Sequence, residues 1–105
     1  MPPVAVVGAT SWGVTLAWLL AERGHDVRLV TRDTGEAAAV RSRRGLERLP
    51  GVVLAPSVAV IAAGEFEGPL DGLVIAVPAQ SVRSTLAQLP EFERPFVLSA
   101  AKGIE

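Results

Sequence analysis

Short runs of apolar residues alternate with segments of helical periodicity along this chain. The run at residues 3–7 is uninterrupted and rich in valine, which is typical of a strand buried on both faces of a sheet. Later apolar runs predict further strands at residues 27–31, 58–61, 73–77 and 96–100. The run at residues 58–61 is the weakest of them.

The segment after the first strand has the periodicity of a helix. In residues 11–23, apolar side chains recur at intervals of three and four residues, as they do on one face of a helix. They are Val14, Ala17, Trp18 and Ala21. Gly24 supplies the left-handed conformation that commonly ends a helix.

Two further helices are predicted. One runs from residue 34 to residue 44, with Asp33 as its N-cap and Gly45 as its stop. The other covers residues 81–89, after Pro78 has ended the fourth strand. Between the third and fourth strands, the segment AAGEFEGPLDG contains three glycines and a proline, and we expect a loop with at most one helical turn.

The alternation of strands and helices predicts the fold class. Such a pattern favours a parallel sheet with right-handed crossovers and helices on its faces. We therefore expect an α/β fold with a doubly wound, Rossmann-like sheet in the strand order 3-2-1-4-5. We expect a single domain over residues 1–105.

Composition and charge exclude several classes of protein. Ten basic and eleven acidic residues give a net charge of −1, which predicts neither nucleic acid nor a membrane surface as a partner. The chain has no cysteine for thiolate chemistry, and its single histidine argues against a histidine-built metal site. With no targeting segment or membrane span visible, we expect a cytoplasmic protein.

The segment GATSWG, residues 8–13, joins the first strand to the first helix. Gly8 lets the chain turn sharply, and Gly13 lets the helix lie close to the sheet. The helix dipole and the amide groups of the first helical turn favour an anion. The segment therefore predicts a pyrophosphate site, where Ser11 serves as the helix cap or donates to a phosphate.

Thr10 stands where such turns commonly carry a middle glycine, which lets a phosphate approach the backbone. Either threonine is tolerated in a wider turn, or its branched side chain weakens cofactor binding. The Gly-Ala-Thr-Gly-x-x-Gly turn of short-chain reductases is excluded, because Ser11 and Val14 stand where that turn has its later glycines.

These motifs resemble the amino-terminal cofactor domain of bacterial NAD(P)-dependent sn-glycerol-3-phosphate dehydrogenases. GATSWG is similar to the family fingerprint GAGSWG. The similarity continues in register with RGHDVRLVTRD, LPGV, VIAVPAQSVR and SAAKGIE. Family members are much longer, and their helical second half with its catalytic lysine has no counterpart here. The resemblance thus implies no catalytic residue within this chain, which we expect to be inactive alone.

The resemblance also implies roles for individual residues. It implies cofactor binding by Gly8, Ser11, Trp12, Gly13, Arg32 and Lys102. Thr10, by its position in the turn, and Pro78, by its position at the end of the fourth strand, are expected to bind the cofactor as well. Lys102 is expected to contact the substrate as well. Trp12 either walls the nicotinamide end or packs over the turn. The chain departs from the family at Thr10, in the loop AAGEFEGPLDG and at Ala101, which replaces a threonine.

Arg32 bears on the choice between NAD and NADP. The resemblance implies that it lies beside the adenosine ribose, where a dehydrogenase that prefers NAD often has an acidic residue. A guanidinium there can instead pair with a 2′-phosphate, so we expect NADP or NAD to bind, with a modest preference for NADP. Asp33 is the alternative ribose ligand, although we favour its role as a helix cap.

Other polar and aromatic residues have less specific interpretations. Lys102 lies just past the last strand, at the sheet edge that binds ligands, or else it is a solvated terminal lysine. His25 is interpreted as a turn residue and Trp18 as part of the core. A solvated face, with a 2′-phosphate contact as the alternative, is expected for Arg41, Arg43, Arg44 and Arg48.

The function that the resemblance implies is hydride transfer between a nicotinamide cofactor and the pair glycerol 3-phosphate and dihydroxyacetone phosphate. One alternative is the cofactor domain of a ketopantoate-type reductase. Another is a stand-alone or degenerate nucleotide-binding module. Because apolar surface is expected to be exposed near the fifth strand, we also predict a homodimer.

Overall fold

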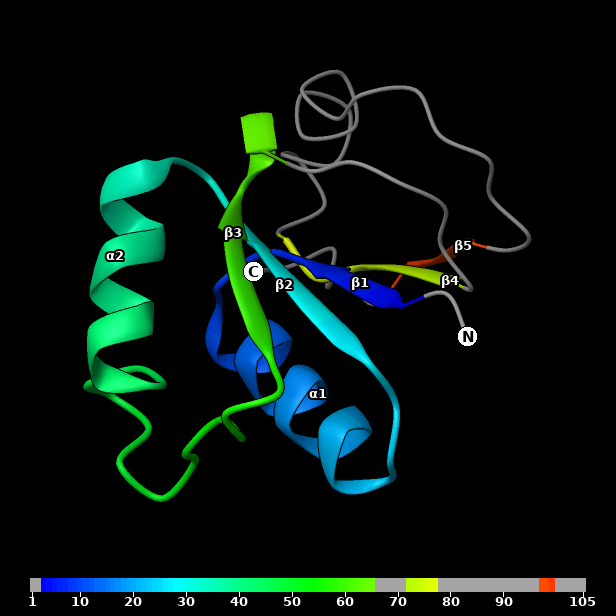
Figure 1. Cartoon of the computed structure of the whole chain (residues 1–105), viewed down its shortest axis with the longest axis horizontal. Coiled ribbons are helices and arrows are strands. Elements are labelled where there is room, and N and C mark those ends of the chain that lie inside the picture. The colour runs from blue at the N-terminus through cyan, green and yellow to red at the C-terminus, as the bar shows by residue number, and fades with distance from the viewer. Residues whose placement is uncertain (1–2, 66–71, 78–96, 100–105) are drawn as a thin grey trace.

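Strands and helices alternate along the chain (Figure 1), in a computed structural model that describes residues 3–65, 72–77 and 97–99. In chain order the elements are β1 (Val4–Val7), α1 (Ser11–Glu22), β2 (Val27–Thr31), α2 (Thr34–Arg43), β3 (Ala59–Ala62), the 3-10 helix η1 (Ala63–Glu65), β4 (Gly72–Ile75) and β5 (Val97–Ser99). In the described part of the chain, no helix has the length and apolar character needed to cross a membrane.

The described strands form one parallel, five-stranded sheet in the order β3-β2-β1-β4-β5. This confirms the predicted fold class and strand order. β1 lies in the middle, where Val4 is in register with Val27 of β2 on one side and with Gly72 of β4 on the other. The strand order reverses at β1, and open α/β sheets bind ligands at the carboxyl ends of the strands at such a point.

The strand side chains enter two apolar clusters, one on each face of the sheet. On one face, α1 packs with Val14 and Ala17, and α2 packs with Ala37 and Val40. The cluster on the other face includes the buried residues Ala5, Val7, Val30, Leu73 and Ile75. Burial on both faces explains why these strands are continuous apolar runs rather than alternating ones.

The ends of the helices follow the predicted signals with one correction. Gly24 has a φ of 91°, and its amide donates to Ala21 O at 3.0 Å, so it ends α1 as expected. For α2 the left-handed residue is Arg44, with a φ of 56°, and not Gly45. Gly45 is required for another reason, because a Cβ there would lie 2.7 Å from Val52 O.

Other boundaries shift by one or two residues. β3 covers Ala59–Ala62 rather than residues 58–61, because the amide of Val58 donates to Ala55 O at 3.0 Å in the preceding turn. β4 covers Gly72–Ile75 rather than residues 73–77. The single turn η1 confirms the expectation for the described start of the following loop. The helix predicted over residues 81–89 lies outside the described residues.

Candidate functional site

The turn after β1 depends on its two glycines. Gly8 has a φ of 119°, and a Cβ at this position would lie 2.7 Å from both Ala76 O and Val77 Cγ1. A Cβ at Gly13 would overlap the carbonyl oxygen of Gly8. The backbone of α1 therefore approaches the turn, and the turn approaches the end of β4, as closely as glycine allows. These are the roles that the sequence predicted for the two glycines.

The same turn is hydrogen bonded to both neighbouring strands. The amide of Gly8 donates to Val30 O of β2 at 2.9 Å, and the Thr10 hydroxyl donates to Ala76 O, just after β4, at 2.7 Å. The turn is thus fixed in position between β2 and the end of β4.

Thr10 is the N-cap of α1. Its Oγ1 accepts a hydrogen bond from the amide of Gly13 at 3.0 Å and donates to Ala76 O at 2.7 Å. Its φ of −86° and ψ of 169° lie in the extended region, so this position does not require glycine. Of the two interpretations, this geometry favours a tolerated threonine. Ser11, which the sequence proposed as the cap, is instead the first residue of the helix.

Arg48 brings a positive charge to the first turn of α1. It lies in the connection between α2 and β3, and its Nε donates to Ser11 Oγ at 2.9 Å. No acidic residue occurs in that first turn. The helix dipole, the first-turn amides and this guanidinium all favour an anion there, although Thr10 already occupies the amide of Gly13. The residues present thus fit a dinucleotide phosphate.

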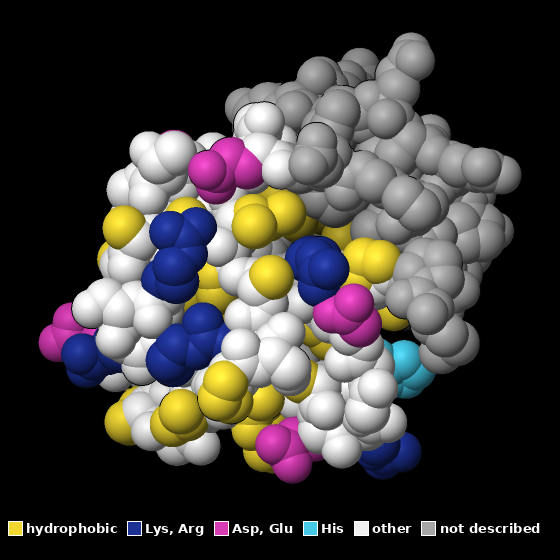
Figure 2. Space-filling model, viewed as in Figure 1, with side chains coloured by type: hydrophobic (Ala, Val, Ile, Leu, Met, Phe, Trp, Pro, Cys, Tyr) yellow, Lys and Arg dark blue, Asp and Glu magenta, His cyan; other side chains and the backbone are white. Residues whose placement is uncertain are grey.

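Two more of the arginines expected on a solvated face make hydrogen bonds, in their case to backbone carbonyls. Arg41 donates through Nε and Nη2 to Val60 O, at 3.0 and 2.6 Å. Arg44 Nη2 lies 2.6 Å from Ala55 O and 2.9 Å from Val58 O. Figure 2 shows arginine side chains set among apolar ones on the face that carries α2 and β3. Arg41 is exposed, as predicted for a solvated face, and Arg44 is partly buried; both also bind backbone carbonyls, which the sequence did not predict.

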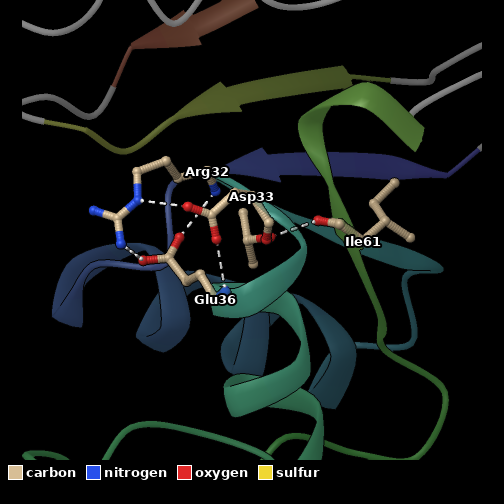
Figure 3. Close-up of polar contacts among 5 residues, drawn as sticks. Arg32, Asp33, Glu36 and Ile61 are labelled. Atoms are coloured by element: carbon tan, nitrogen blue, oxygen red, sulfur yellow. Dashed lines mark hydrogen bonds and ion pairs between the residues drawn. The ribbon is translucent and has the colours of Figure 1, made fainter.

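Arg32 directly follows β2, and its neighbours are acidic (Figure 3). Its Nε is 3.4 Å from Asp33 Oδ2, and its Nη2 is 3.5 Å from Glu36 Oε2. Glu36 Oε1 also accepts the backbone amide of Arg32 at 2.9 Å. The Arg32 side chain is 74% exposed, so its outer face remains open to an anion.

Asp33 is the N-cap of α2, as the sequence predicted. Its Oδ1 accepts the amide of Glu36 at 2.8 Å. That hydrogen bond, together with the nearby positive charge of Arg32, lowers the pKa of Asp33 from its ordinary value of 3.8. The carboxylate is therefore charged at neutral pH, next to the expected position of the ribose.

The buried hydroxyl of Thr31 fixes the end of β2 beneath this cluster. Its Oγ1 lies 3.0 Å from both Asp33 O and Ile61 O of β3, and the contact with Ile61 is the dashed line that ends at that residue in Figure 3. The position of Arg32 relative to the sheet is thus set by a side chain that is itself 2% exposed. The sequence did not single out Thr31.

The remaining predicted residues are placed only in part. Trp12 is 43% exposed at the start of α1, which is compatible with both of its proposed roles. Trp18 packs against the core, and His25 is an exposed residue after the Gly24 turn, as predicted. Pro78 and Lys102 lie outside the described residues.

Comparison with known sequences identifies the family. A sequence model described as the N-terminus of NAD-dependent glycerol-3-phosphate dehydrogenase matches residues 3–105. The chain belongs to this family. Membership confirms the resemblance seen in the sequence and argues against the ketopantoate-type alternative. As members of the same family, this chain and its relatives share an NAD-binding amino-terminal domain.

The relatives are much longer than this chain. The NAD(P)+ glycerol-3-phosphate dehydrogenase of Acidiphilium cryptum is 45% identical over 104 residues, which are 99% of this chain and 31% of that protein. The corresponding protein of Bradyrhizobium diazoefficiens is 41% identical over 97% of this chain and 32% of its own length. The chain thus spans about a third of the length of these relatives.

Solved structures agree on the fold. A glycerol-3-phosphate dehydrogenase from Coxiella burnetii superimposes with a TM-score of 0.71 and 23% identity, over 97% of this chain and 34% of that one. D-mandelate dehydrogenase in complex with NADH gives a TM-score of 0.70 and 18% identity, with the same coverage. At these identities the likeness shows the Rossmann-like fold alone.

Proposed function

We propose that this chain is the cofactor-binding part of an enzyme that interconverts sn-glycerol 3-phosphate and dihydroxyacetone phosphate. NAD or NADP supplies the hydride chemistry when bound, and the chain orients it. The observation that carries the proposal is the turn from Gly8 to Gly13, placed at the reversal of strand order in a member of this family.

The pyrophosphate is proposed to bind at the first turn of α1. Ser11 and Gly13 belong to that turn, and Arg48 reaches it through its bond to Ser11. The Thr10 hydroxyl is held by Ala76 O and by the amide of Gly13. The proposed pyrophosphate site is therefore formed by backbone amides and one guanidinium, and Thr10 borders it.

For the adenosine end, we propose that Arg32 pairs with the 2′-phosphate of NADP and gives a modest preference for it. The exposed outer face of the guanidinium supports this role. The Arg32→Ala variant is expected to lose that preference. An unchanged ratio of NADPH to NADH affinity in this variant would remove Arg32 from the site.

Lys102, from the family resemblance, and Pro78, from its position after the fourth strand, complete the proposed site. Both follow strands of the sheet in the sequence, and the carboxyl ends of parallel strands meet at one edge. We propose that Pro78 borders the cofactor and that Lys102 contacts the cofactor and the phosphorylated substrate. Lys102→Met tests this assignment, with weaker cofactor binding as the expected result.

Calorimetric titration with NADH and NADPH tests the function itself. Each is expected to bind one site per chain, whereas FMN, a mononucleotide that lacks the adenosine end, serves as the control ligand. Glycerol 3-phosphate oxidation by this chain alone is expected to be undetectable. Absence of binding by a chain that is folded by circular dichroism would leave a degenerate module as the better description.

We also propose that the chain forms homodimers and acts in the cytoplasm. The apolar surface expected near the fifth strand supports the dimer, and Leu19 adds an apolar side chain that is 41% exposed on α1. Sedimentation at increasing concentration tests the dimer, and a constant monomer mass would refute it. Fractionation of cells that produce the chain tests its location.

A further inference from the structure

A carboxylate lies against the guanidinium that is proposed to select the cofactor. Glu36 contacts Arg32 twice, with Oε1 on the backbone amide at 2.9 Å and Oε2 at 3.5 Å from Nη2. We propose that Glu36 is a specificity-determining residue that limits the preference of Arg32 for a 2′-phosphate. The inference rests on the proposed function, because it concerns the adenosine end of the same cofactor site.

The charges around Arg32 do not favour a dianion as strongly as the arginine alone would. Asp33 Oδ2 lies 3.4 Å from Arg32 Nε, so one guanidinium faces two carboxylates. Together the one basic and two acidic side chains carry a formal charge of −1. A 2′-phosphate that approaches Arg32 is attracted by the guanidinium and repelled by both carboxylates. A 2′-hydroxyl carries no charge and can donate to a carboxylate, so NADH loses nothing from their presence.

Glu36 is better placed than Asp33 to exert this effect. Its side chain is 24% exposed, against 58% for Asp33, so solvent and salt screen its charge less. Asp33 Oδ1 is already occupied by the amide of Glu36 at the N-cap. Because Glu36 holds both the amide and the guanidinium of Arg32, it also fixes the position from which Arg32 meets the ribose.

The Glu36→Gln variant separates the charge of this side chain from its structural bond. Glutamine keeps a carbonyl oxygen that can accept the Arg32 amide, but it removes the negative charge from the guanidinium. The ratio of NADPH to NADH affinity, measured by calorimetry on the full chain, is expected to rise by about two- to fivefold. A merely structural role would change both affinities together and leave this ratio unchanged.

Glu47→Gln is the matched control. Glu47 is exposed in the connection after α2, so its substitution makes the same change in net charge. Its affinity ratio is expected to equal that of the parent chain. A rise of the same size in Glu47→Gln would show that net charge, rather than the contact with Arg32, is responsible, and it would overturn the inference.

The remaining outcomes are also decisive. If the parent binds both cofactors and Glu36→Gln leaves the ratio unchanged or lowers it, the inference fails while the proposed function stands. If the folded parent binds neither cofactor, the proposed function fails and the inference fails with it. If Glu36→Gln does not fold, Glu36→Asp replaces it, because the shorter side chain withdraws the charge from Nη2. Its ratio is expected to rise by a smaller factor, and no rise would overturn the inference.

Discussion

The turn after β1 and the end of β2 are both expected to contact one cofactor, but they are built in opposite ways. The turn is made of backbone, with Gly8 and Gly13 packed so closely that neither accepts a Cβ without displacement. The end of β2 is made of exposed, charged side chains, with Arg32 between Asp33 and Glu36. The geometry of the first region depends on close packing, whereas the properties of the second depend on the charges of its side chains.

This difference separates two properties of the proposed site. NAD and NADP share the pyrophosphate, so the backbone turn after β1 is expected to bind both and to contribute affinity without a preference for either. They differ at the 2′-position of the adenosine ribose, which the charged cluster is proposed to meet. Substitutions in the turn should therefore change stability and overall affinity, and those at the end of β2 should change the preference.

The largest effect is expected from Gly13→Ala. The added Cβ overlaps Gly8 O, a backbone atom that cannot move without shifting the turn, so the free energy of unfolding should fall by about 3 kcal/mol or more. Urea denaturation measures the change. Gly35→Ala in α2 is the matched control, because its Cβ would only touch Asp33 Oδ1 at 3.4 Å. Similar losses in the two variants would contradict the close packing of the turn.

A smaller loss of stability is expected from Thr10→Ala. The variant removes the N-cap bond to Gly13 and the bond to Ala76 O, and we expect unfolding to become easier by about 1–2 kcal/mol. Thr10→Ser keeps the hydroxyl and should recover most of this loss. Cofactor affinity of Thr10→Ser should match the parent. A marked gain in affinity on removing the branched methyl would instead support the interpretation that threonine obstructs the phosphate.

The Arg48→Gln variant tests whether the turn serves both cofactors equally. Loss of the guanidinium beside Ser11 should weaken NADH and NADPH binding by a similar factor, about fivefold, because both carry the pyrophosphate. Calorimetry measures both constants. Arg43→Gln, an exposed position at the end of α2, is the control for net charge. A loss confined to NADPH would place Arg48 at the 2′-phosphate, the alternative that the sequence left open.

The backbone turn and the cap Asp33 were predictable from the sequence, but the contacts that Arg48 and Glu36 make were not. Gly8 and Gly13 lie between a buried strand and a helix, and their spacing was enough to predict the close packing of the turn. Arg48 reaches Ser11 across 37 residues of sequence, through a connection without a regular pattern. Only the folded sheet brings them together, so no local signal identifies this contact.

The cap positions show a similar division. Asp33 was predicted as a cap, because an acidic residue before a helix is a strong local signal. Thr10 was missed as a cap, since its position in the turn directed attention to the phosphate and not to the amide of Gly13. Glu36 was also missed, although its spacing from Asp33 is that of a capping box. The capping-box spacing could have identified Glu36 from the sequence, but its contact with the Arg32 guanidinium is seen only in the structure.

The smallest expected effect is a pH dependence that arises from Asp33. Its pKa is lowered in the folded chain, first by the amide of Glu36, so its charge stabilises the fold. This contribution is fully present above the ordinary value of 3.8 and is lost as the pH falls through the lower folded pKa. Asp33→Asn keeps a good N-cap without a titrating group. The stability difference between parent and variant, measured by urea denaturation from pH 6 downward, should therefore move against the parent only below about pH 4. A difference that stays constant over this range would mean that the charge of Asp33 contributes no stability and that only its hydrogen bond does. The end of β2 would then not differ from the turn after β1 in the way that Asp33 stabilises the fold.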